Sequence, residues 1–144
     1  MTVVREMLDA APVPIDLGAD AVADAIEACM VCAQACTSCA NSCLAEDDVA
    51  ELSRCIALCT ECEDVCSATL RALSRPYESD HAVTHRLLSA CVRTCSDSAE
   101  ECERHAAHHH HCAVCEKACR ACLEACRTLL EAEKFRELEK LAGG

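Results

Sequence analysis

Cysteine offers most of the chemistry in this chain, because 17 of its 144 residues are cysteines. Within each of four groups they follow one another at steps of three or four residues, apart from one step of seven in the third group, which places successive side chains on one face of an α-helix. The groups are Cys29, Cys32, Cys36, Cys39 and Cys43; Cys55, Cys59, Cys62 and Cys66; Cys91, Cys95 and Cys102; and Cys112, Cys115, Cys119, Cys122 and Cys126. In the third group Ser98 stands at the step where the pattern would place another cysteine. Each group is therefore a stripe of thiols in the positions where bundled helices normally bury Leu, Ile or Val.

An interior lined by these thiols would be poorly packed without something to fill it. A cysteine is much smaller than a leucine, and large-to-small replacement in a core costs roughly 2–5 kcal/mol per site. Bound metal ions would fill the space. Thiolates are soft ligands that select Cu(I), zinc or iron–sulfur clusters, so the stripes predict a metal-binding core.

The spacing favours Cu(I) among these metals. Structural zinc sites bring Cys-x-x-Cys pairs from different elements around one ion, whereas pairs such as Cys29 and Cys32 lie inside a helix whose stripe continues. Iron–sulfur clusters take cysteines in characteristic runs ending near proline, and the sequence has no such run. A continuous column of thiols suits many Cu(I) ions joined by bridging thiolates. Zinc or a mixed metal pool, iron–sulfur chemistry and disulfide redox chemistry are the alternatives.

Five histidines lie between residues 105 and 111, next to the end of the third stripe. Four of them are spaced to face the thiols and are predicted as further metal ligands: His105, His108, His109 and His111. His105 and His109 follow Cys102 by three and seven residues, and the other two precede cysteines of the fourth stripe by four. Imidazole binds copper and exchanges it more readily than a thiolate cage, so this end is predicted to be a mouth for loading and release. A polar turn that is merely rich in histidine is the alternative.

The opposite end of the stripes is predicted to be closed by an apolar plug. Its members are Val22, Ile26, Leu70, Leu73, Leu87, Leu88, Leu129 and Leu130. His81 and His85 also lie at this end, and the sequence assigns them no role. Glu78 and His81 have the Glu-x-x-His spacing of di-iron bundles, but such sites need two of these units and further carboxylates in the core. Met30 lies off the cysteine stripe and is predicted to pack rather than to bind metal.

Helices are expected to position the stripes at residues 19–45, 48–74, 79–107 and 109–132. Short connections between helices of similar length, without strand signals, predict an all-α fold: an antiparallel up-down four-helix bundle with a Cys-lined core. The chain is expected to be a single domain of residues 1–144. It would comprise a short N-terminal helical segment (1–15), the bundle (19–133) and a C-terminal tail (134–144).

Few glycines and prolines mark the helix ends, so capping residues and length decide them. Asp48 with Glu51 has the spacing of a capping pair for the second helix, and Ser79 or Asp80 can cap the third. A turn near residues 107–110 is needed, because one helix over residues 79–132 would extend about 80 Å. Antiparallel stacking then predicts levels of thiols across the bundle. From the plug these are Cys29, Cys66, Cys91 and Cys126; Cys32, Cys62, Cys95 and Cys122; Cys36, Cys59, Ser98 and Cys119; Cys39, Cys55, Cys102 and Cys115; then Cys43 and Cys112.

The remaining composition bears on compartment and partners. The N-terminus does not have the basic and apolar pattern of a signal peptide, and no apolar run approaches the roughly 20 residues of a membrane span. We therefore expect the protein to be cytoplasmic. In the reducing cytoplasm, clustered cysteines more often bind metal than form disulfides. The formal charge of −12 disfavours nucleic acid and anionic membranes as partners.

These stripes and the histidine-rich segment resemble the bacterial copper storage proteins, in particular their cytosolic branch. The resemblance covers residues 19–133 and rests on Cys-x-x-Cys-x-x-x-Cys-x-x-Cys-x-x-x-Cys in the first and fourth helices, with the matching stripe in the second. It implies Cu(I) bound by cysteine pairs and bridging thiolates, histidines at the open end, and a homotetramer. The ligand role would pass to all 17 cysteines, and to His105, His109 and His111.

The expected function is storage and buffering of multiple Cu(I) ions rather than catalysis. The sequence shows no nucleophile with an associated base and orienting group, so a redox enzyme is not supported. A copper chaperone that delivers one ion, or a detoxifying zinc/copper-thiolate protein, is the alternative. Copper chaperones or cuproenzymes would be the partners that exchange copper with a store.

Overall fold

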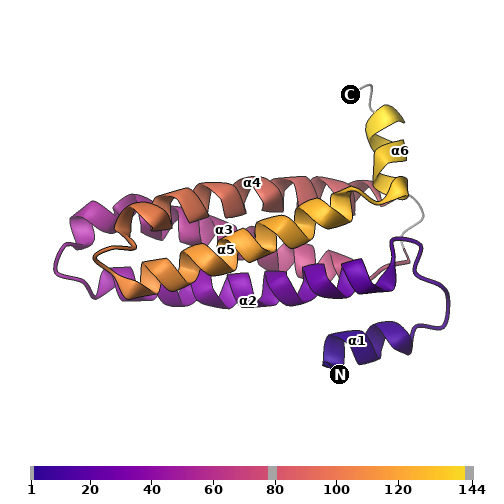
Figure 1. Cartoon of the computed structure of the whole chain (residues 1–144), viewed down its shortest axis with the longest axis horizontal. Coiled ribbons are helices and arrows are strands. Elements are labelled where there is room, and N and C mark those ends of the chain that lie inside the picture. The colour runs from indigo at the N-terminus through magenta and orange to yellow at the C-terminus, as the bar shows by residue number, and fades with distance from the viewer. Residues whose placement is uncertain (1, 78–80, 142–144) are drawn as a thin grey trace.

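The computed structural model describes residues 2–77 and 81–141, and helices make up most of these residues (Figure 1). In chain order they are α1 (Val3–Asp9), α2 (Ala19–Leu44), the short 3-10 helix η1 (Val49–Leu52), α3 (Ser53–Leu73), α4 (Ala82–His105), α5 (His110–Leu130) and α6 (Glu133–Leu141). The described residues include no β-strand.

The four long helices α2 to α5 form the predicted antiparallel bundle (Figure 1). α2 packs against α3 and α5, and α4 packs against the same two helices, so sequence neighbours are also neighbours in space. Each helix turns its cysteine stripe inward, where the side chains are buried. α2 is long and apolar enough to span a membrane by length and composition alone, but its most apolar window is 50% buried inside the bundle. The fold class predicted from the sequence is confirmed.

Helix ends agree with the expected breaks, with one exception. A turn over residues 106–109 separates α4 from α5, as predicted. The capping pair predicted at Asp48 and Glu51 is wrong, because Asp48 caps no helix with its side chain and η1 intervenes before α3. The Asp48 carboxylate instead accepts a hydrogen bond from the His109 ring at 3.0 Å. The cap expected at Ser79 or Asp80 lies outside the described residues, as does Glu78 of the Glu-x-x-His pattern. The helix α4 begins directly after His81, which has a left-handed φ of 58°.

The end of the bundle opposite the histidines is closed by apolar side chains, as expected. Five of the eight predicted plug residues are buried, namely Val22, Ile26, Leu73, Leu88 and Leu129, and the other three are half-buried. Phe135 of α6 is fully buried here and lies against the rings of His81 and His85, with centroids 6.2 and 5.6 Å away. The His81 ring pairs with Asp16 at 3.0 Å. The helix expected only as a tail therefore helps to cover the plug.

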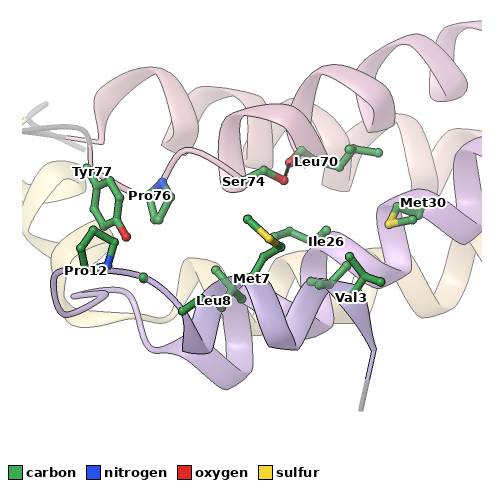
Figure 2. Close-up of a pocket in the computed structure, with 13 residues that line it drawn as sticks. Val3, Met7, Leu8, Pro12, Ile26, Met30, Leu70, Ser74, Pro76 and Tyr77 are labelled. Carbon is green, nitrogen blue, oxygen red and sulfur yellow. Dashed lines mark hydrogen bonds between the residues drawn. The ribbon is translucent and has the colours of Figure 1, made fainter.

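The N-terminal segment contains the helix α1, as predicted, and lies beside α2 (Figure 1). Arg5 holds it there through ion pairs with Asp20 at 3.2 Å and Glu27 at 3.9 Å. An apolar groove remains between α1, α2 and the end of α3, and Figure 2 shows Met7 and Met30 lining it. Met30 thus lies outside the thiol-lined core and is 48% exposed.

Candidate metal centre

All 17 cysteines are buried in the bundle, with at most 1% of each residue exposed, and none forms a disulfide. Their burial follows from the stripes, because every stripe position of a helix in a four-helix bundle faces the three other helices. The core between plug and mouth is therefore lined by thiols instead of branched aliphatic side chains. Free buried thiols at this density are a preformed set of soft ligands.

The sulfurs nearest the plug lie within contact of one another. Cys29 Sγ is 3.6 Å from Cys122 Sγ and 3.9 Å from the sulfurs of Cys91 and Cys126. Cys66 Sγ adds contacts of 3.7 Å to Cys91 and 3.9 Å to Cys122. The structure brings together the four cysteines of the first predicted level, and it adds Cys122 from the second.

The next levels continue the same spacing toward the mouth. Cys32 Sγ lies 3.8 Å from Cys62, 4.0 Å from Cys95 and 3.7 Å from Cys119. Cys119 belongs to the third predicted level, so the cysteines of α5 lie between levels rather than within them. Side chains of packed helices interdigitate as knobs into holes, and this geometry produces the offset.

Many of these sulfurs belong to more than one group of possible ligands. Groups with all ligand atoms within 4.8 Å of one another include Cys29, Cys66, Cys91 and Cys122; Cys32, Cys66, Cys95 and Cys122; Cys32, Cys36, Cys62 and Cys119; Cys39, Cys59, Cys102 and Cys115; and Cys39, Cys43, Cys112 and His111. Cys55 adjoins this column through a contact of 3.8 Å with Cys102. Shared sulfurs can bridge ions between groups, and contacts of Cys115 with Cys36 at 3.8 Å and Cys119 at 3.9 Å join the plug side to the mouth side, so the sulfurs form one column.

At the mouth the ring of His111 reaches the thiols. Its Nδ1 lies 3.5 Å from Cys39 Sγ and 3.6 Å from Cys112 Sγ. Its Nε2 faces the other way, 3.3 Å from an oxygen of Glu46. When Nε2 donates its proton to the carboxylate, the lone pair of Nδ1 is free to bind a metal ion beside the two sulfurs.

Comparison with known proteins agrees with this donor set. The family model described as copper storage protein matches residues 19–131. The chain belongs to the copper storage protein family. The cytosolic copper storage protein Ccsp of Streptomyces lividans, loaded with 10 copper equivalents, is 44% identical and superposes with a TM-score of 0.88 over 90% of this chain and 99% of that one.

Two further relatives extend the comparison. The Streptomyces lividans protein with five coppers is 50% identical, with a TM-score of 0.76 over 77% of this chain and 92% of its own. The uncharacterized cysteine-rich protein YhjQ of Bacillus subtilis is 36% identical over 93 residues, which cover 65% of this chain and 81% of that protein. The identity to the copper-loaded protein is high enough for the shared bundle to reflect a shared family.

The four histidines predicted as ligands have different surroundings in this family member. Within the part of the chain that the structure describes, His111 is the one of the four whose ring contacts cysteine sulfur; the His105 ring pairs with Glu101 at 2.9 Å, and the His109 ring pairs with Asp48 and Glu46. The expectation that His108 faces the thiols is wrong, because its side chain is exposed. Counting four residues back from a cysteine assumes an unbroken helix, and His108 lies in the turn before α5.

Carboxylates at the mouth were not predicted from the sequence. Glu46 contacts the rings of both His109 and His111, and these rings stack with centroids 5.5 Å apart. Glu101 is 7% exposed at its side chain and pairs with Arg54 at 3.4 Å as well as with a histidine. A signal was available: the acidic run at residues 46–48 follows the first stripe, and an antiparallel bundle brings that turn beside the histidine-rich turn.

Hydrogen bonding and burial shift the pKa values of several groups at the mouth. The hydrogen bond to Asp48 raises the pKa of His109 above its usual value, and the same bond lowers the pKa of the Asp48 carboxyl. Burial raises the pKa of the Cys43 thiol, and it raises the pKa of Cys112 from 9.0 to about 12. The thiols nearest the mouth are therefore protonated near neutral pH, and binding of a metal ion must displace their protons.

We expect the metal-free protein to lose stability in alkali. Folding raises the pKa of Cys112, so its contribution to stability is complete below pH 9.0 and is lost as the pH rises toward about 12. The free energy of unfolding, measured by denaturant titration under anaerobic reducing conditions, should fall across this interval. The copper-loaded protein is the control, because its thiolates have already lost their protons. An equal fall in both forms would contradict this explanation.

Proposed function

We propose that this protein stores and buffers multiple Cu(I) ions in the cytosol, bound by the thiolates of its bundle. The observation that carries the proposal is the column of buried sulfurs, in which contacts of 3.6 to 4.0 Å recur along the bundle and the mouth group joins the next group within 4.8 Å. The Streptomyces lividans protein is described with five coppers in one structure and loaded with 10 copper equivalents in another, which supports a cargo of many ions. Enclosed thiolates would also keep Cu(I) away from oxidants.

Distance alone does not distinguish copper from zinc. Sulfurs around a tetrahedral zinc ion stand about 3.8 Å apart, given a Zn–S bond of about 2.3 Å. The two metals are distinguished by the sharing of sulfurs between groups of possible ligands. The shared sulfurs are those of Cys32, Cys39, Cys66 and Cys122. Structural zinc sites close four ligands around one ion, whereas a column of shared soft sulfurs suits Cu(I) with its lower coordination number.

The mouth is proposed as the place where copper is loaded and released. His111 and the nearby thiols of Cys39, Cys43 and Cys112 form the outermost group of possible ligands. Cys39 lies 3.8 Å from Cys112 and also belongs to the next group inward with Cys115, which lies 3.8 Å from Cys36, so an ion can move inward by exchanging one thiolate for the next. The opposite end is closed by the buried apolar side chains of the plug, which supports traffic through the histidine end.

Binding rather than catalysis is proposed for the same column. The thiols are at most 1% exposed, so a substrate larger than an ion does not reach them. By family resemblance the protein would assemble as a homotetramer and exchange copper with a chaperone or a cuproenzyme. Function as a copper chaperone, or as a detoxifying zinc/copper-thiolate protein, is the alternative.

Anaerobic titration of the reduced protein with Cu(I) against a competing chelator tests the proposal. Retention of on the order of one copper per cysteine after gel filtration is expected, because bridging thiolates let the ion count approach the ligand count. Saturation at one or two ions would favour a chaperone, and preference for zinc over copper would favour a zinc protein. Either result would contradict copper storage.

A further inference from the structure

Ser98 is the one position of the third stripe where a hydroxyl replaces the thiol that the pattern would place there. It is fully buried inside the column. Its Oγ lies 3.5 Å from Cys119 Sγ, 3.6 Å from Cys59 Sγ and 4.0 Å from Cys36 Sγ. The hydroxyl therefore points at the sulfurs of three other helices, as a ligand at this level would.

The Ser98 hydroxyl cannot replace a thiolate as a ligand of Cu(I) at this level. Alcohol oxygen is a hard donor, whereas Cu(I) selects soft sulfur, and a neutral hydroxyl does not bridge two such ions. It can instead donate one hydrogen bond to a thiolate, which lowers the electron density that this sulfur offers to copper. The level of Ser98 is thus the one of the four full levels that has only three sulfurs.

Two ligand groups that flank this level have no cysteine in common. Cys36 and Cys119 fall in a group with Cys32 and Cys62, toward the plug. Cys59 falls in a group with Cys39, Cys102 and Cys115, toward the mouth. Ser98 contacts members of both groups and therefore stands at their boundary.

Given the proposed copper store, we propose that Ser98 divides it into an outer pool that exchanges quickly and an inner pool that exchanges slowly. The outer pool comprises Cys39, Cys43, Cys55, Cys59, Cys102, Cys112, Cys115 and His111. The inner pool comprises Cys29, Cys32, Cys36, Cys62, Cys66, Cys91, Cys95, Cys119, Cys122 and Cys126. Ser98 is a positioning residue in this scheme, because it sets where bridging between the pools is weakest.

Passage between the pools then depends on few sulfurs. Cys115 lies 3.8 Å from Cys36 and 3.9 Å from Cys119, which connects the outer pool to the inner one. Cys59, on α3, faces the Ser98 hydroxyl of α4, where a thiol would have continued the path. An ion that moves inward past Ser98 thus has one sulfur fewer to exchange onto than at the levels above and below.

Release kinetics of the loaded protein test this division. The wild-type protein and the variants Ser98→Cys and Ser98→Ala are saturated with Cu(I), freed of excess ion and mixed with a strong Cu(I) chelator. We expect two phases for the wild type, with the slow rate lower by roughly tenfold, the scale of effects of groups around a metal site. Ser98→Cys should merge the phases and retain about one additional copper, because it completes the ligand set of the third level.

Ser98→Ala is the matched control. It removes the hydroxyl without adding sulfur, so two phases should persist. A single phase in a wild-type protein that still retains many coppers would overturn the division and leave copper storage intact. Unchanged phases and amplitudes in a helical, fully loaded Ser98→Cys protein would overturn it as well. Failure of the wild type to retain several coppers would instead overturn the store on which the division rests.

Discussion

Loading with Cu(I) is expected to raise the melting temperature of this protein by more than about 20 °C. The metal-free core consists largely of small thiols, and most of its larger fully buried side chains, such as Leu88, Leu129 and Phe135, lie at the plug. A ligand that binds only the folded chain at 100 times its Kd contributes about 2.7 kcal/mol per site. Each kcal/mol raises the melting temperature of a domain of this size by roughly 2–4 °C, so several ions are sufficient.

Thermal unfolding followed by circular dichroism, with and without Cu(I) under anaerobic conditions, measures this shift. Mg²⁺ at the same concentration is the control, because it prefers oxygen ligands and should leave the melting temperature unchanged. Unfolded thiols also bind copper, which reduces the shift but does not reverse it. A rise of less than about 5 °C at saturation would show that the ions do not hold the core together.

His111→Ala is expected to slow copper loading by about tenfold or more, while lowering the final capacity by one ion at most. The ring is the imidazole whose Nδ1 faces Cys39 and Cys112, and it is 25% exposed at its side chain, so it can contact an arriving ion and the outermost sulfurs together. Stopped-flow mixing of the reduced protein with a Cu(I) donor complex, followed by thiolate-to-copper absorbance, measures the rate.

Two companion variants separate ligation from general effects of the turn. His110→Ala removes the neighbouring exposed imidazole and should load at the wild-type rate. Glu46→Gln leaves the ring in place but removes the charged acceptor of Nε2, so an intermediate rate is expected. Equal rates for His111→Ala and His110→Ala would contradict a role of His111 in loading.

The helices and their stripes are predictable from the sequence because the information is periodic and local. Steps of three and four residues place the cysteines on one face of each helix, and a four-helix bundle buries all four stripes at once. Length limits required the break that the structure places at residues 106–109. The apolar plug followed in the same way, since its buried members continue the stripes.

Features that depend on contacts between distant segments are harder to predict from the sequence. Asp48 resembles a helix cap locally, but its carboxylate pairs with His109 from the facing turn. His108 was misplaced for a related reason, because the helical periodicity stops at the turn. Phe135 belongs to the apolar face of a short amphipathic helix, but only the folded chain shows that it packs against His81 and His85.

Anomalous diffraction from copper-loaded crystals, recorded on both sides of the copper absorption edge, tests the central claim most directly. A column of copper sites between the sulfurs of α2 to α5, extending from His111 toward Cys126, is the predicted result. One or two ions confined to the histidine turn or to the groove beside Met30, with the interior thiols bound to no metal, would contradict storage in the bundle core.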